Sequence, residues 1–320
     1  MRAVEDVSFT IAPGETLGLV GESGSGKSTT GRLILRLIDA TAGKCSFDGA
    51  DVFSLSNSEM RSLRRKMQIV FQDPYGAFNP RMTVGRIIGE ALELRGITGR
   101  SERDAEIGRL LVLVQLDPAV RNRYPHEFSG GQRQRIGIAR ALAVEPTFLV
   151  ADEPVSALDV STQAEIVNLL LDLQKRLGLT MLFISHDLSV VRILADRIAV
   201  MYAGRILEMA SAGSLFTHPL HPYTQELLNA IPEPDPERAH KAQRERAGQS
   251  GDTADTPAES GCPYAGRCPH VMPICREQMP AFVNYASDLG EAAQHPTACH
   301  WVAQSLPIEG SDTEINGAPG

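Results

Sequence analysis

The stretch Gly21-Glu22-Ser23-Gly24-Ser25-Gly26-Lys27-Ser28 fits the pattern G-x-x-x-x-G-K-[ST]. A short apolar run, Leu17 to Val20, precedes it and is typical of a buried strand, while residues 29–38 follow with apolar side chains at helical spacing. Glycines in such a strand, loop and helix let successive backbone N–H groups surround an anion at the helix N-terminus. The stretch therefore predicts a loop that binds phosphate groups.

Two side chains of this loop have chemistry of their own. Lys27 is expected to reach the β- and γ-phosphates of a nucleotide, and the Ser28 hydroxyl is expected to bind Mg²⁺. The backbone from Gly21 to Ser28, continued by Thr29, is expected to hold the phosphates. The alternative is a Gly/Ser turn that happens to contain a lysine, but the strand-like and helix-like flanks argue against it.

An acidic pair, Asp152-Glu153, ends the apolar run from Phe148 to Ala151. A carboxylate at the C-terminal end of a strand beside the phosphate loop can hold Mg²⁺, and Asp152 is predicted to do so. Glu153 is predicted to orient and polarise the attacking water. The alternative is that both acids only end the strand in solvent.

The chain has 320 residues, enough for one large domain with an appendage or for two domains. No apolar run approaches the ~18 residues that a membrane span needs, and the N-terminus has no apolar signal-peptide core. Residues 230–320 hold 13 acidic and 6 basic side chains and so carry −7 of the total charge of −8. Because a basic footprint is missing, nucleic acid is not an expected partner. A cytosolic protein is expected.

Buried strands alternate with helices along most of the chain, which indicates an α/β fold with a mostly parallel sheet. The expected strands are residues 4–11, 17–20, 45–47, 67–71, 148–151, 179–184, 197–202 and 205–210. The expected helices are residues 29–38, 57–66 (capped by Asn57 or Ser58), 129–143, 161–177, 221–231, one that ends at 195, and an insertion within 83–116. Cys45 is expected to be a small buried residue of its strand.

Composition divides the chain further. Residues 1–231 form the predicted main domain, with a helical subdomain over about 73–143. Residues 232–260, rich in Pro, Gly and polar side chains, are expected to be a linker. Residues 261–301 form a small cysteine-bearing extension, and residues 302–320 are expected to be a disordered tail.

Phe128-Ser129-Gly130-Gly131-Gln132 is the sharpest remaining motif. Alone it fits an N-capped helix with a glycine-rich start, but it also resembles the signature of the ATP-binding cassette (ABC) ATPases. Further motifs of that family stand in the expected order, so that the resemblance covers roughly residues 4–230. They are Gln72 (the glutamine loop), Ser156-Ala157-Leu158-Asp159 (the loop facing the opposite subunit) and His186 (the switch histidine).

The resemblance implies a P-loop NTPase of the ABC type that hydrolyses ATP. Two cassettes would face head to tail, so that the phosphate loop of one and the signature of the other enclose each ATP. Gln72 and His186 would act beside Glu153 in catalysis, and Gln72 would contact Mg²⁺ together with Ser28 and Asp152. The implied nucleotide contacts of the motifs beyond the phosphate loop are Ser129, Gly130, Gly131, Gln132 and Asp159. A nucleotide-binding module without hydrolysis is disfavoured by Glu153, Gln72 and His186.

The aromatic residue that stacks on adenine in this family lies upstream of the segment matching Val4 to Phe9. The start at Met1 leaves little room for such a residue. The resemblance therefore predicts firm binding of the phosphates and weak binding of adenine, with Phe9 as a core residue.

Two further segments resemble the ATPases of oligopeptide, dipeptide and nickel importers: Gln72-Asp73-Pro74-Tyr75-Gly76-Ala77-Phe78-Asn79-Pro80-Arg81 and His218-Pro219-Leu220-His221-Pro222-Tyr223-Thr224. This implies a peripheral subunit at the cytoplasmic face of the membrane that powers the import of peptides or related solutes. Its implied partners are a second, similar ATPase in a heterodimer, two membrane permeases and, indirectly, an extracytoplasmic solute-binding protein. The alternative is a soluble ABC ATPase with no role in transport.

Four of the five cysteines gather near the C-terminus with the spacing C-x₅-C-x₆-C-x₂₃-C: Cys262, Cys268, Cys275 and Cys299. In a cytosolic protein such a group suggests a metal before disulfides, and four thiolates suit Zn²⁺ or a four-iron cluster. Zinc sites more often have narrower C-x₂₋₄-C pairs, and the resemblance to the importer ATPases implies a [4Fe–4S] cluster. Zinc and free thiols are the alternatives, with His270, His295 and His300 as bystanders.

Overall fold

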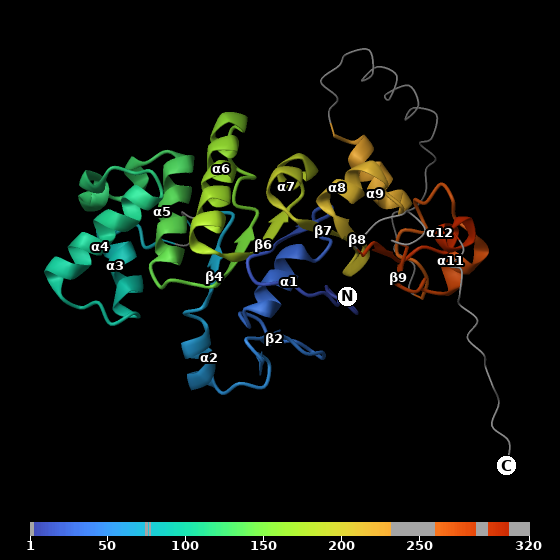
Figure 1. Ribbon diagram of the computed structural model, residues 1–320, viewed down its shortest axis with the longest axis horizontal. Coiled ribbons are helices and arrows are strands. Elements are labelled where there is room, and N and C mark those ends of the chain that lie inside the picture. The colour runs from blue at the N-terminus through green and yellow to red at the C-terminus, as the bar shows by residue number, and fades with distance from the viewer. Residues whose placement is uncertain (1–2, 74–75, 77, 232–259, 286–293, 307–320) are drawn as a thin grey trace.

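The computed structural model describes residues 3–73, 76, 78–231, 260–285 and 294–306 (Figure 1). At its centre lies a sheet with the strand order β4-β5-β6-β1-β7-β8-β10-β9. Its parallel strands are β4 (Met67–Val70), β5 (Phe148–Asp152), β6 (Thr180–Ser185), β1 (Thr16–Val20) and β7 (Arg197–Tyr202). The prediction of an α/β fold with a mostly parallel sheet is confirmed.

Strand β1 is buried on both faces, as the strands of a covered parallel sheet must be. Leu17 and Leu19 point to the face that α1 (Lys27–Ile34) covers. Gly18 points to the opposite face, against α7 (Leu188–Leu194). A Cβ atom at Gly18 would lie 2.3 Å from Cγ1 of Val191, so only glycine allows this close approach. The phosphate loop therefore starts from a rigid strand.

The sheet lies between helices on both of its faces (Figure 1). α6 (Val160–Leu177) and α7 lie on one face, and α1 lies on the other. The prediction that the helix after the phosphate loop reaches Ile38 is wrong, because α1 ends at Ile34. Arg36 has a left-handed φ of 48°, and Leu37 and Ile38 are exposed.

A helical insertion stands beyond β4, at the left of Figure 1. It comprises α3 (Val84–Glu93), α4 (Arg100–Leu113), the 3₁₀ turns η1 (Pro118–Asn122) and η2 (Pro125–Glu127), and α5 (Gly130–Leu142). Of the apolar residues that predicted its first two helices, Ala91 is half-buried and the others are buried in its core: Ile87, Ile88, Leu92, Ile107, Leu110, Leu111 and Val114. The helical character predicted for 83–116 is confirmed.

Three local predictions near the N-terminus are wrong. Residues 4–11 are not a strand. Their alternating apolar side chains pack half-buried against the α1 face of the core, and no strand in the described part of the chain pairs with them. Cys45 is half-buried and precedes the short hairpin of β2 (Ser46–Phe47) and β3 (Ala50–Asp51). The cap of α2 (Asn57–Leu63) is Ser56, whose hydroxyl accepts the Glu59 N–H.

The cysteine-bearing region extends the central sheet, which the sequence did not predict, whereas the adjacent strands predicted at 197–202 and 205–210 are confirmed. β8 (Arg205–Ser211) runs antiparallel to β7, and it is followed by α8 (Ala212–Thr217) and α9 (Pro222–Asn229). The cysteine-bearing region holds α11 (Pro273–Glu277), β9 (Val283–Asn284), β10 (Pro296–Thr297) and α12 (His300–Ser305). β10 pairs with β8, which joins this region to the main sheet.

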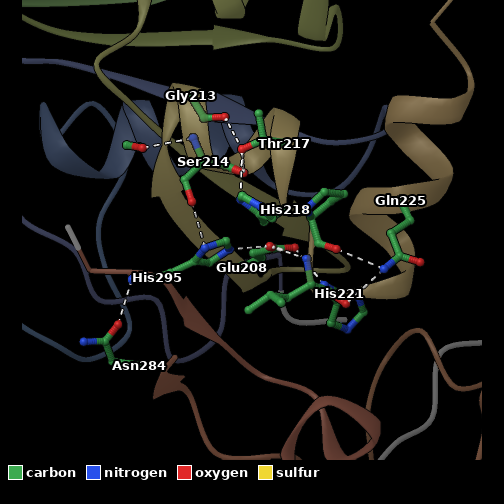
Figure 2. A network of polar contacts seen from close by, with 12 residues as sticks. Glu208, Gly213, Ser214, Thr217, His218, His221, Gln225, Asn284 and His295 are labelled. Atoms are coloured by element: carbon green, nitrogen blue, oxygen red, sulfur yellow. Dashed lines mark hydrogen bonds and ion pairs between the residues drawn. The ribbon is translucent and has the colours of Figure 1, made fainter. Parts of the chain in front are cut away.

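A buried polar network joins the same two regions (Figure 2). Glu208 of β8 accepts the N–H groups of Leu220 and His221 at 2.8 and 2.9 Å, and His295 Nε2 lies 2.7 Å from its Oε1. His295 Nδ1 lies 3.1 Å from the Ser214 hydroxyl. Glu208 and His295 are both fully buried, so this network anchors the cysteine-bearing region.

The predicted tail is wrong in its first residues, because α12 continues to Ser305 and Val302 is buried. The remainder of the tail from residue 307, and the predicted linker up to residue 259, lie outside the described residues.

Candidate functional site

The phosphate loop connects β1 to α1 as predicted, and its lysine is folded back onto it. Lys27 Nζ donates to the carbonyl oxygens of Gly21 and Glu22, each at 2.8 Å, and burial lowers its pKa. Gly26, which caps α1, has a φ of 104°, and a Cβ there would lie 2.4 Å from the Ala3 carbonyl oxygen. The loop conformation therefore requires glycine at this position.

Ser28 and Asp152 meet across the loop and the end of β5. The Ser28 hydroxyl donates to Asp152 Oδ1 at 2.6 Å, and Arg32 lies 3.9 Å from the other carboxylate oxygen. Burial raises the pKa of Asp152, against the opposing effect of the Ser28 hydrogen bond. A hydroxyl and a carboxylate side by side are hard oxygen donors of the kind that Mg²⁺ prefers, so this pair fits the predicted ion.

Glu153 and His186 come together at the ends of neighbouring strands. Glu153 Oε2 lies 3.3 Å from His186 Nδ1, and the Glu153 N–H donates to the Ile184 carbonyl. Glu153 has a left-handed φ of 47°, unusual for a residue with a side chain. Such strain is often found at functional sites, here next to the strand end that carries Asp152.

An open cavity of about 420 Å³ lies over this group. Its lining residues are Gly21, Glu22, Ser23, Glu153, His186 and Leu227. The predicted catalytic carboxylate, the predicted switch histidine and the start of the phosphate loop thus face one space. Gly24, Ser25 and Thr29 belong to the same loop and to the first turn of α1.

Gln72 is exposed two residues beyond the end of β4, the strand beside β5. This places it at the same edge of the sheet as Asp152, though it does not line the cavity. Its proposed contact with Mg²⁺ stays a prediction.

The signature segment lies away from the phosphate loop of its own chain, at the N-terminus of α5 (Figure 1). Ser129 caps the helix and accepts the Gln132 N–H, while the Gln132 side chain accepts the Ser129 N–H. A Cβ on Gly131 would lie 2.3 Å from Cγ2 of Thr162, so this glycine lets α5 pack against α6. Ser129, Gly130 and Gln132 are exposed.

Asp159 caps α6 in this structure. Its carboxylate accepts the Ser161 hydroxyl, and the N–H and hydroxyl of Thr162, and these bonds hold its pKa far below its usual range. The side chain is exposed beside the signature segment, so the cap is compatible with the predicted contact to another subunit.

Two residues from the C-terminal half also hold the phosphate loop, and sequence reasoning missed both. The Glu22 N–H donates to the Tyr223 hydroxyl at 2.9 Å, and Arg267 Nη1 lies 2.9 Å from Glu22 Oε2. Tyr223 lies in the segment of residues 218–224, which resembles the importer ATPases, and Arg267 lies between Cys262 and Cys268. Each of these hydrogen bonds joins residues that are more than two hundred positions apart, so no local sequence pattern indicates it.

The thiols of Cys262, Cys268, Cys275 and Cys299 lie close enough for their charges to affect one another. Burial raises the pKa of Cys262 to about 12 and that of Cys268 to about 11, and the neighbouring thiols add to both shifts. The nearby backbone N–H groups of Tyr264, His270, Trp301 and Val302 oppose the rise in pKa at Cys262, Cys268 and Cys299. Such donors favour the thiolate, the form that binds metals.

Among the described residues these thiols are not placed as the ligands of a single metal ion. Within the described part of the chain, no three His, Cys, Asp or Glu side chains are placed as ligands of one ion. The nearby histidines have other partners: His270 stacks on Trp301, His300 lies 3.0 Å from the Gln278 carbonyl, and His295 contacts Glu208. The donor chemistry thus fits a thiolate-bound metal, while the side chains are not placed to hold one ion.

A helix of sufficient length and apolarity to cross a bilayer is not found among the residues that the structure describes.

Comparison with known proteins agrees with this site. Residues 4–156 match the family model described as "ABC transporter", and residues 207–275 match "Oligopeptide/dipeptide transporter, C-terminal region". A Brucella ovis protein named as a peptide import ATP-binding protein is 57% identical over 88% of this chain and 87% of its own. The oligopeptide transport ATP-binding protein AppF of Bacillus subtilis is 48% identical over 94% of this chain and 89% of its own.

Solved structures of cassettes have the same fold. The dimeric, post-hydrolysis structure of the ATP-binding cassette MJ0796 bound to ADP and Pi is 33% identical, with a TM-score of 0.61. The match covers 66% of this chain and 90% of that one. CbiO1 of Clostridium perfringens, part of the cbiONQ transporter complex, is 26% identical with a TM-score of 0.64, over 75% and 92% of the two chains.

Proposed function

The chain belongs to the ATP-binding subunits of ABC transporters, among the peptide import ATP-binding proteins, and we propose that it hydrolyses ATP to power peptide uptake through membrane permeases. The observation that carries this proposal is the convergence of the phosphate loop, Glu153 and His186 on one open cavity. Phosphoryl transfer to water needs these groups: donors for the phosphates, a carboxylate for the water and a partner for the γ-phosphate.

Each residue has a distinct task in this proposal. Lys27 leaves the carbonyl oxygens of Gly21 and Glu22 and donates to the β- and γ-phosphates, where its positive charge is stabilised. Glu153 orients the attacking water and polarises it. His186, held beside Glu153, donates to the γ-phosphate and loses this contact when phosphate leaves.

Mg²⁺ would be held by Ser28, with Asp152 and Gln72 nearby, and it would neutralise charge that develops on the phosphates. In this structure the Ser28 hydroxyl donates to Asp152 Oδ1, which keeps the two oxygens adjacent.

The site is half of a composite one in this proposal. Ser129, Gly130 and Gln132 are exposed and lie away from the phosphate loop of their own chain, so they are available to a second cassette. The N-terminus of α5 adds backbone donors that suit an anionic phosphate. We propose a similar but distinct ATPase as the partner, docked on two permeases at the cytoplasmic face of the membrane, with a solute-binding protein outside.

Reconstitution with its candidate permeases, partner ATPase and solute-binding protein tests the transport role. The complex should take up labelled peptide into vesicles only when ATP and Mg²⁺ are supplied on the cassette side. A Glu153→Gln complex should assemble and fail to transport. ATP hydrolysis that is indifferent to permease and peptide, with the protein bound to ribosomes instead, would favour a soluble ABC ATPase.

We propose further that Cys262, Cys268, Cys275 and Cys299 hold a [4Fe–4S] cluster, with zinc as the alternative. The proposal is supported by the gathering of four thiols in one small region, where nearby backbone N–H groups lower the pKa of three of them. Anaerobically purified protein should then be brown, contain about four irons per chain and lose both features in Cys268→Ser. Colourless protein with one zinc per chain would favour zinc, and metal-free protein would leave free thiols.

A further inference from the structure

Glu22 is the only acidic residue within the phosphate loop, and each of its polar groups is held by another residue. Its N–H donates to Tyr223, its carbonyl oxygen accepts Lys27 Nζ and the Ser25 N–H, and its carboxylate binds Arg267. Two of these four partners belong to the loop, while the other two come from the C-terminal half of the chain. The position of Glu22 therefore depends on two residues that lie outside the phosphate loop.

Arg267 is held on both sides of its guanidinium. Nη1 lies 2.9 Å from Glu22 Oε2, and Nη2 lies 2.5 Å from Oε1 of Glu226 in α9. The Tyr264 hydroxyl donates to the other oxygen of Glu226. The Arg267 side chain is only 25% exposed, and the bond to Glu22 raises its pKa. The planar guanidinium of Arg267 is thus held between α9 and the phosphate loop.

The charge of Glu22 opposes the task of the loop. Glu22 lines the cavity, and a carboxylate there repels the phosphates that the loop must bind. A guanidinium at hydrogen-bonding distance neutralises that charge and keeps the carboxylate oriented toward Arg267. The Tyr223 hydroxyl accepts the N–H of Glu22. The main chain and the side-chain charge of Glu22 are therefore both held by residues of the C-terminal half.

We propose that Arg267 is a positioning residue of the ATP site, which acts by holding and neutralising Glu22 in the phosphate loop. The inference rests on the proposed phosphate site and deepens it. It assigns part of the nucleotide affinity of the cassette to the cysteine-bearing region. None of the described residues of that region is among the residues that line the cavity. Arg267 affects ATP binding and does not act in the chemical step.

The test compares KM for ATP, kcat and the Kd of a fluorescent ATP analogue across variants of the full chain. Arg267→Ala should raise KM and Kd about 5- to 10-fold, with kcat within about 2-fold. Glu22→Gln in the Arg267→Ala background should restore most of the affinity, because it removes the unpaired charge. Arg276→Ala, an exposed arginine of the same region, is the matched control and should change neither constant.

Glu22→Asp provides a second test from the side of the loop, should Arg267→Ala fail to fold. It keeps the charge but shortens the side chain, so that Arg267 can no longer reach it, and KM should rise. Unchanged KM in both variants, or a double variant no better than Arg267→Ala, would overturn the inference while wild-type hydrolysis leaves the proposed function intact. A wild-type chain that neither binds nor hydrolyses ATP would overturn both.

Discussion

Glu153 Oε2 and His186 Nδ1 lie 3.3 Å apart, although the two residues leave different strands of the sheet. β5 and β6 are parallel neighbours, with Asp152 in register with Ile184, so their C-terminal ends bring the pair together. The Glu153 side chain is 16% exposed, whereas that of His186 is 54% exposed. The carboxylate is therefore fixed, and the imidazole has room to turn toward a bound γ-phosphate.

His186→Ala should lower kcat for ATP hydrolysis about 100-fold and leave the Kd for ATP within about 3-fold. The reason is that one donor to the γ-phosphate is lost in the transition state, while the loop that binds the nucleotide is kept. Steady-state ATPase assays with nucleotide titrations check both numbers. The exposed His218→Ala serves as control, and equal kcat in the two variants would remove His186 from the mechanism.

Lys27→Ala should weaken ATP binding about 10- to 100-fold. A charge-assisted hydrogen bond contributes about 1.5–3 kcal/mol, and no nearby lysine of the loop can replace it. Binding of a fluorescent ATP analogue measures the loss. Lys44→Ala removes an exposed lysine outside the loop and should bind normally. Equal affinities in the two variants would argue against the phosphate-loop assignment.

Glu208→Ala should destabilise the fold by about 3–5 kcal/mol. The substitution leaves His295 and the N–H groups of Leu220 and His221 buried without their acceptor. Denaturant unfolding of the variant, compared with the exposed Glu277→Ala, gives the difference. A loss below about 1 kcal/mol would show that the network contributes little to the anchoring of the cysteine-bearing region.

His221 should make stability fall in mild acid. Burial lowers its pKa from 6.5 to about 4 in the folded chain, where Nδ1 accepts the Tyr223 N–H. Between pH 6.5 and about 4, His221 therefore binds a proton in the unfolded chain but not in the folded chain. Its effect is absent above that pH and grows to about 3 kcal/mol of lost stability as pH falls to 4.

Denaturant unfolding at pH 7.5, 6 and 5 measures this slope against His221→Asn, which keeps an acceptor at the cap of α9. The variant should lose stability less steeply with falling pH because asparagine does not titrate. Parallel curves for the two proteins would contradict the neutral, buried state of His221.

Local patterns in the sequence predicted those parts of the site that lie within one stretch of chain. The glycines and Lys27 define a loop whose conformation depends on its own residues, and Ser129 predicted the start of α5 because an N-cap acts within one turn. The acids after the apolar run of β5 were predictable from the geometry of parallel strands. These features need no knowledge of distant partners.

Features that depend on distant partners were not predictable. Residues 4–11 alternate like a strand, but no strand among the described residues pairs with them, and an alternating pattern does not show whether a partner strand is present. The pairing of β10 with β8, and the contact of Arg267 with Glu22, join segments separated by about ninety and more than two hundred residues. Polar contacts of this kind are set by the packing of whole regions.

ATP turnover by the Glu153→Gln variant tests the assignment of ATP hydrolysis to this chain most directly. Glutamine keeps the shape of the side chain but cannot activate water, so turnover should fall at least 100-fold while ATP binding stays within about 3-fold. ATP-bound cassette pairs should then accumulate in size-exclusion chromatography. Turnover equal to that of wild type and of the Glu277→Gln control would contradict the role of Glu153 and the mechanism built on it.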